Sequence, residues 1–341
     1  PMSHVHRFGS QLFGRRSLAS LRFLLPGLVV GLSPIVLADS SRQSLEQDLA
    51  PSSLVAQSSA ASLPSSRPMA SMVQSVRLNS SAAMVVDQVS GQVLIEKNAD
   101  AELPIASITK LMTALVVLDA HLPLDEKIII TRSDARLEKN PPSRLPVGAR
   151  LTRGELLHLA LMSSENRAAQ ALGRSYPGGL SAFVRAMNVK AVKLGMASTR
   201  FTEPTGLNSG NVSSPRDLIR LVEEAYLHPE IRRYSTAKQL SIKVRGRTLQ
   251  FRNSNVLVRA ERWDLGLSKT GFIRDAGRCL VMQAEVESRP VIIVMLDAQG
   301  KRHRVRDAET IRKVLIQKAD APAIHDRSKS QTEQSLARNP V

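Results

Sequence analysis

Residues 279–296 read CLVMQAEVESRPVIIVML. The two apolar runs in this stretch, 279–286 and 291–296, predict a pair of β-strands joined through Glu287–Pro290. A similar pair lies far upstream, where Ala82–Asp87 and Gln92–Glu96 flank the turn-forming sequence QVSG at 88–91. Leu267–Ile273 can form a further strand. Strands at both ends of one region predict an antiparallel sheet of about five strands, built from N- and C-terminal parts.

The residues between these strands have helical patterns. Thr152 and Glu155 form a capping-box signature ahead of an apolar run. A second helix is expected from Ser181, with Gly195 just past its end, and a third opens at Ser214-Pro215. The sequence therefore predicts an α/β (α+β) fold in which a helical lobe is inserted into the sheet. Clefts between such lobes commonly form binding sites.

The two ends of the chain differ in composition from its middle. Residues 1–38 place arginines before the apolar run 23–37 and end in Val36-Leu37-Ala38, the layout of a secretory signal cleaved after about Ala38. Residues 39–75 are rich in Ser, Ala and Pro, which predicts a flexible leader, and 321–341 form a polar tail. We expect 76–320 to be one folded domain and the protein to be exported to the periplasm.

The composition excludes several functional classes. The 341 residues contain 47 Lys and Arg against 30 Asp and Glu, a formal charge of +17, yet only 3% are aromatic. Few bases could therefore stack on the protein, and the basic segments 243–247 and 301–304 fit a hairpin turn and a helix start better than a nucleic-acid site. A single cysteine, Cys279, excludes a disulfide framework and a cysteine-cluster metal site.

Ser107-Ile108-Thr109-Lys110 opens a helix with apolar residues at steps of three and four. This spacing places Ser107 and Lys110 on one face at the helix start. A serine hydroxyl needs a base to become a nucleophile, and a desolvated lysine can be that base. A capping serine followed by a solvated lysine gives the same local pattern, so this motif alone is weak evidence for catalysis.

Two further short motifs follow in the chain. Ser163-Ser164-Glu165-Asn166 interrupts an apolar helix and predicts either a helix–helix corner or a place where Ser164 moves a proton and Asn166 binds a peptide. Lys269-Thr270-Gly271 lies in the strand candidate 267–273, where a glycine permits close approach of a ligand or another backbone. Their order and separations carry more information than any one of them.

Together these motifs resemble those of the penicillin-binding proteins and serine β-lactamases, whose signature is S-x-x-K, S-x-N and K-T-G. Among these, the sequence is most similar to the low-molecular-mass D-alanyl-D-alanine peptidases of the endopeptidase type. The similarity covers about 80–300 and extends to Tyr176–Gly179 and Phe201–Leu207. It implies a β-lactamase/transpeptidase-like fold.

The resemblance also implies a set of residue roles. Ser107 is expected to attack a D-alanine carbonyl with Lys110 as base, and Ser164 to relay the proton. Asn166, Lys269, Thr270 and Gly271 are expected to bind substrate, and the backbone N–H groups of Ser107 and Phe272 to form the oxyanion hole. The general base within this wider family is disputed.

The implied reaction is endopeptidase cleavage of D-Ala to diaminopimelate cross-links in peptidoglycan. Carboxypeptidase activity is the main alternative, and a β-lactamase or a catalytically silent wall-binding protein is less favoured. We expect peptidoglycan stem peptides as substrate and β-lactams as covalent inhibitors. We expect no metal, cofactor or nucleic acid, and we consider peripheral association with the membrane or with other wall hydrolases.

Overall fold

The computed structural model describes residues 76–136, 143–260, 262–300 and 302–319. The predicted signal segment 1–38, the leader 39–75 and the tail 321–341 lie outside these residues. The domain limits remain predictions for the same reason.

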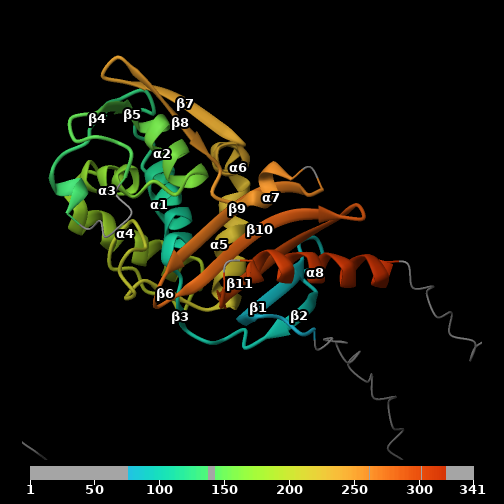
Figure 1. Ribbon diagram of the computed structural model, residues 1–341. Coiled ribbons are helices and arrows are strands. Elements are labelled where there is room, and N and C mark those ends of the chain that lie inside the picture. The colour runs from blue at the N-terminus through green and yellow to red at the C-terminus, as the bar shows by residue number, and fades with distance from the viewer. Residues whose placement is uncertain (1–75, 137–142, 261, 301, 320–341) are drawn as a thin grey trace, which may run out of the picture. The chain divides into compact units, whose positions relative to one another are not determined.

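The centre of the fold is an antiparallel sheet of five strands (Figure 1), as the sequence predicts. Its strands are β1 (Ser80–Asp87), β2 (Val93–Lys97), β9 (Asp264–Ile273), β10 (Gly277–Val286) and β11 (Arg289–Ala298). The spatial order is β2-β1-β11-β10-β9, so the N-terminal hairpin pairs with the C-terminal strands through β1 and β11. This order leaves β9 at one edge of the sheet.

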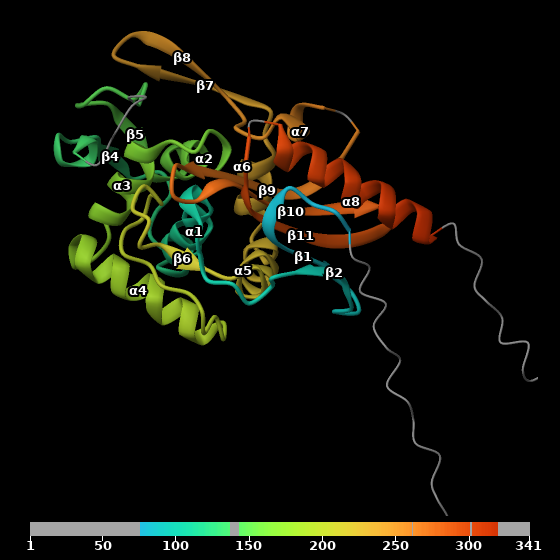
Figure 2. The ribbon, with the colours of Figure 1, turned by 60° about the horizontal axis from the view of Figure 1, so that its bottom comes forward.

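Both faces of the sheet are covered, which explains why its strands are apolar throughout. On β11, Ile293 and Met295 pack toward helix α8 (His303–Ala319). The alternate residues Ile292 and Val294 belong to the core that contains helix α5 (Pro215–Leu227). Figure 2 shows α5 and α8 on opposite sides of the strands.

The turn between β10 and β11 is shorter than predicted. It consists of Glu287 and Ser288, both with positive φ (50° and 57°), while Arg289 and Pro290 belong to β11. A two-residue turn with both φ positive matches the right-handed twist of the strands, but it usually contains Asn or Gly. Because this sequence contains neither, the prediction of a longer connection was wrong.

The helical insertion lies between β2 and β9 in the chain. Its helices are α1 (Thr109–Asp119), α2 (Arg153–Met162), α3 (Asn166–Arg174), α4 (Gly179–Lys193), α5, α6 (Pro229–Thr236) and the short α7 (Val256–Arg259). Three small strand pairs accompany them: β3 (Leu103–Pro104) with β6 (Val212–Ser213), β4 (Lys127–Ile129) with β5 (Arg150–Thr152), and β7 (Gln239–Val244) with β8 (Arg247–Arg252).

The signals predicted for the ends of α2, α4 and α5 agree with the structure, with a shift at the start of α4. Thr152 and Glu155 exchange both hydrogen bonds of a capping box. Helix α4 starts at Gly179, two residues before the predicted start, because Gly178 (φ 81°) forms its N-cap. Gly195 (φ 68°) ends the same helix in a Schellman motif, in which the Met196 N–H donates to the Ala191 carbonyl.

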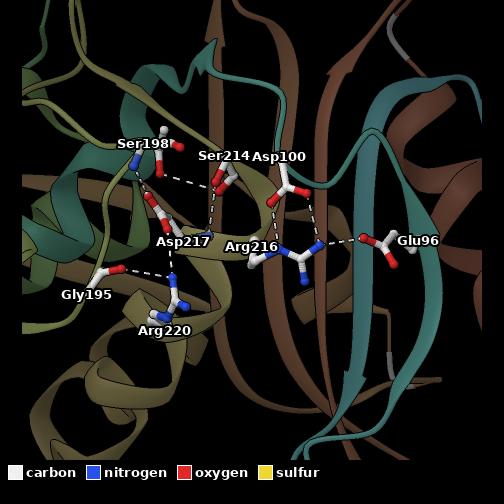
Figure 3. Close-up of polar contacts among 9 residues, drawn as sticks. Glu96, Asp100, Gly195, Ser198, Ser214, Arg216, Asp217 and Arg220 are labelled. Carbon is white, nitrogen blue, oxygen red and sulfur yellow. Dashed lines mark hydrogen bonds and ion pairs between the residues drawn. The ribbon is translucent and has the colours of Figure 1, made fainter. Parts of the chain in front are cut away.

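Polar contacts at the start of α5 attach the insertion to the sheet (Figure 3). The Arg216 guanidinium contacts Glu96 on β2 at 2.6 Å and Asp100 at 2.6 Å. Ser214 caps the helix by accepting from the Asp217 N–H, and the Asp217 carboxylate accepts from the Ser198 N–H at 2.8 Å. These bonds fix α5 against the edge of β2 and the loop that follows α4.

Candidate active site

Ser107 lies in a 3₁₀ turn, η1 (Ala106–Ile108), that leads directly into α1. The α-helix itself begins at Thr109, two residues later than expected. Lys110 lies one turn beyond Ser107, and its ammonium donates to Ser107 Oγ at 2.8 Å. The same ammonium donates to Asn166 Oδ1 at 2.8 Å and to the Thr205 carbonyl at 2.5 Å. The first two motifs therefore meet at one amino group.

The second motif is the predicted corner between α2 and α3. The N–H groups of Ser163 and Glu165 both donate to the Leu159 carbonyl at 3.1 Å, which closes the turn. Ser164 lies between them with φ 60°, an uncommon conformation for a non-glycine residue that is frequent at functional sites. Its Oγ accepts a hydrogen bond of 2.9 Å from Lys269 Nζ.

The third motif lies on β9, the edge strand beside η1. A Cβ atom at Gly271 would lie 2.8 Å from the Ile105 carbonyl oxygen and 3.2 Å from the Ser107 nitrogen. Only glycine lets β9 approach the serine turn this closely, so the glycine serves the approach of another backbone. Thr270 Oγ1 donates to Ser254 Oγ at 2.7 Å, which fixes its side chain.

Both lysines of the site are buried, and their pKa values fall. Burial lowers the pKa of Lys110 to about 8, while the charges of Glu203 and Glu165 act to raise it. Burial also lowers the pKa of Lys269 well below its usual range, and the positive charges of Lys110 and Arg304 add to this effect. Each lysine can therefore lose its proton more readily than a surface lysine.

A buried loop supports Lys110, and the sequence patterns did not identify its role. The Glu203 carboxylate accepts from the N–H groups of Thr205 at 2.6 Å and Gly206 at 2.5 Å, and from Asn211 Nδ2 at 3.1 Å. These bonds shape the turn whose Thr205 carbonyl holds Lys110. A carboxylate two residues before such a turn is a signal for backbone capping, but it does not reveal which lysine the turn reaches.

Gly206 in this loop has a strict steric role. Its φ is 79°, and an added Cβ would lie 1.9 Å from the Ala106 carbonyl oxygen. The loop therefore packs backbone against backbone on the turn that carries Ser107.

The structure brings the predicted site residues into two adjacent hydrogen-bonded groups, Ser107 with Lys110 and Asn166, and Ser164 with Lys269. Thr270 and Gly271 adjoin them on β9. The Phe272 side chain is 54% exposed, with the Arg278 guanidinium 4.4 Å from its ring centre. The oxyanion roles of the Ser107 and Phe272 N–H groups remain predictions.

Beside the second motif lies a pocket that the motif analysis did not identify. Its lining residues are Ser143, Arg144, Ser163, Ser164, Glu165, Asn166, Phe251 and Arg252. In the ranges that the structure describes, no group of three His, Cys, Asp or Glu side chains could hold a metal ion. No helix in those ranges is long and apolar enough to cross a membrane.

Comparison with known proteins agrees with the fold and the motifs. A D-alanyl-D-alanine endopeptidase of Pseudomonas aeruginosa is 47% identical over 250 residues, 73% of this chain and 81% of that protein. The Streptomyces K15 DD-transpeptidase structure matches 70% of this chain and 97% of its own with a TM-score of 0.65 and 28% identity. Penicillin-binding protein D2 of Listeria monocytogenes, in a cefotaxime-bound form, matches 71% and 98% with a TM-score of 0.63 and 30% identity.

The fold and its motifs define a serine DD-peptidase with a β-lactamase/transpeptidase-like architecture. More narrowly, the chain belongs to the peptidase S11 family, described as D-alanyl-D-alanine carboxypeptidase, whose pattern matches residues 69–300.

Proposed function

We propose that this protein is a D-alanyl-D-alanine endopeptidase that cleaves D-Ala to diaminopimelate cross-links in peptidoglycan through an acyl-enzyme on Ser107. The observation that carries the proposal is the 2.8 Å hydrogen bond from the buried Lys110 ammonium to Ser107 Oγ. The Pseudomonas relative named as an endopeptidase supports the choice of reaction.

In the first step, Ser107 Oγ attacks the D-alanine carbonyl and Lys110 takes its proton. With a pKa of about 8, roughly a tenth of Lys110 is unprotonated at pH 7, far more than of a lysine in water. The new bond joins Oγ to the carbonyl carbon, and the bond to the diaminopimelate amine breaks. Ser164 delivers a proton to that amine, since its Oγ is bonded to Lys269.

The remaining residues bind and orient the peptide. β9 is the edge strand, so an extended peptide can add alongside it. The Asn166 amide binds the acyl strand, and Lys269 and Thr270 bind the carboxylate beside the scissile bond. The N–H groups of Ser107 and Phe272 stabilise the oxyanion, and water then releases the acyl group.

β-Lactams should acylate the same serine, because their strained amide resembles the D-Ala-D-Ala terminus. The cefotaxime-bound relative supports this expectation. A substrate in the cell wall, together with the secretory-signal pattern at residues 1–38, favours the periplasm as the location.

A labelling experiment tests the nucleophile. The purified protein should gain the mass of one fluorescent penicillin, and Ser107→Ala should gain none. A matched control, Ser163→Ala, removes a neighbouring hydroxyl whose one hydrogen bond among the described residues goes to the Leu159 carbonyl, and this variant should still be labelled. Labelling of the Ser107 variant at another residue would show that the nucleophile is wrong.

A substrate comparison tests the reaction type. The endopeptidase should cleave cross-linked muropeptide dimers between D-Ala and diaminopimelate. Carboxypeptidase activity is the second candidate, because the family is described by that name. Release of free D-alanine from pentapeptide monomers with intact dimers would assign the protein to that reaction instead.

A further inference from the structure

The pocket beside Ser164 and Asn166 is continuous with the proposed catalytic group. Asn166 Oδ1 accepts from the same Lys110 ammonium that donates to Ser107 Oγ, both at 2.8 Å. The pocket therefore begins within one side chain's length of the attacking serine. It lies on the side where Asn166 would bind the acyl strand.

Two arginines give this pocket positive charge. Arg144 and Arg252 are both exposed, and neither has an ion-pair partner among the described residues. The Arg144 guanidinium stacks 4.2 Å from the ring centre of Phe251, which is only 1% exposed and so forms a fixed support. A guanidinium stacked on a ring keeps its N–H edge free for a planar carboxylate.

The same pocket also carries negative charge. Glu165 lines it and is 8% exposed, and Ser143 Oγ donates to the Glu165 carboxylate. A pocket lined by both arginines and a carboxylate suits a group that has both an amino and a carboxyl function.

We propose, on the basis of the proposed function, that this pocket binds the free amino and carboxylate end of diaminopimelate in the strand that forms the acyl-enzyme. That residue precedes the D-alanine whose carbonyl is attacked, and its side chain carries the group on three methylenes. Arg144 and Arg252 bind its carboxylate. The pocket thus selects the stem peptide on the acyl side of the bond.

The experiment compares two muropeptide dimers, one unmodified and one amidated at that diaminopimelate carboxyl. For the wild type, we expect amidation to lower kcat/KM about tenfold, the size of one charge-assisted contact. The Arg144→Gln and Arg252→Gln variants should each lower kcat/KM for the unmodified dimer and leave that for the amidated dimer unchanged. Most of the tenfold difference between the two dimers should therefore disappear. Arg185→Gln, which removes an exposed arginine on α4, is the matched control and should keep the full tenfold difference.

Penicillin has no diaminopimelate side chain, so its acylation rate checks the fold of each variant. Equal cleavage of both dimers by the wild type, or an equal loss on both by the arginine variants, would overturn the pocket assignment. An effect only when the other strand is amidated would also overturn it. If the protein does not cleave dimers but releases D-alanine from pentapeptides, the endopeptidase proposal is wrong. The pocket proposal is then tested on pentapeptides that are amidated at the same diaminopimelate carboxyl.

Discussion

The Gly206→Ala variant tests whether the position of the turn that carries Ser107 controls the rate of acylation. The new Cβ would lie 1.9 Å from the Ala106 carbonyl oxygen, whereas real Cβ contacts do not fall below 3.0 Å. The two backbones must therefore separate by at least about 1 Å, and a displacement of this size at reacting groups costs about 100-fold in rate. We expect the rate of penicillin acylation of Ser107 to fall by about that factor.

Gly195→Ala is the control for the backbone conformation alone. Gly195 also has a positive φ, 68°, but no atom lies within 4 Å of an added Cβ. Gly195→Ala should lower the free energy of unfolding by about 1 to 2 kcal/mol because alanine is strained at positive φ. Gly206→Ala should lower it by more, because the clash with the Ala106 carbonyl adds to that strain. Urea unfolding measures this loss, and stopped-flow labelling measures the rate. A Gly206→Ala rate within threefold of the wild type would refute the steric argument.

Two further predictions concern charge. Acylation by the wild type should rise with pH through about 8, the pKa of Lys110, because the proposed base is its free amine. Glu203→Gln removes a charge that raises this pKa, so the midpoint of the pH profile should move to lower pH. A uniform loss of rate without a shift would contradict the electrostatic role of Glu203. The pKa of Asp87 is lowered to about 2 by the Ser90 N–H and Arg289. The contribution of Asp87 to stability is therefore present above about pH 4 and lost as the pH falls toward 2. Asp87→Asn should lower the free energy of unfolding in urea by about 1 to 2 kcal/mol at pH 7 and leave it unchanged near pH 2. An equal loss at both pH values would contradict this role of the carboxylate.

Local signals in the sequence were enough for much of the fold. The capping box at Thr152 and the αL glycine at Gly195 act within one helix turn, so their residues reveal the structure directly. The turn at Glu287 and Ser288 did not follow this rule, because tertiary pairing of β10 with β11 holds ordinary residues at positive φ. The turn preferences of individual residues do not indicate a backbone conformation that is set by strand pairing in the surrounding sheet.

The site was predictable only in part, for a related reason. The three motifs name residues that meet in space, but the resemblance at Phe201–Leu207 gave no role to the loop that holds Lys110. Thr205 lies 95 residues from Lys110, and the bond between them depends on how Glu203 folds its own turn. Such a contact is set by packing of that loop against α1, where Thr113 Oγ1 donates to the Pro204 carbonyl, and no short stretch of sequence contains both partners.

The two buried lysines show why this support matters for the chemistry. Burial lowers the pKa of both, yet carboxylates act on Lys110 and cations act on Lys269. If Lys110 takes the serine proton, its new charge further disfavours the proton on Lys269, which is bonded to Ser164 Oγ at 2.9 Å. Proton gain at Lys110 thus favours proton release at Lys269, toward the Ser164 hydroxyl that is the proton donor to the leaving amine in the proposed mechanism. In the proposed mechanism, this coupling gives Lys110 the base function and Lys269 the acid function, although the two side chains are chemically identical.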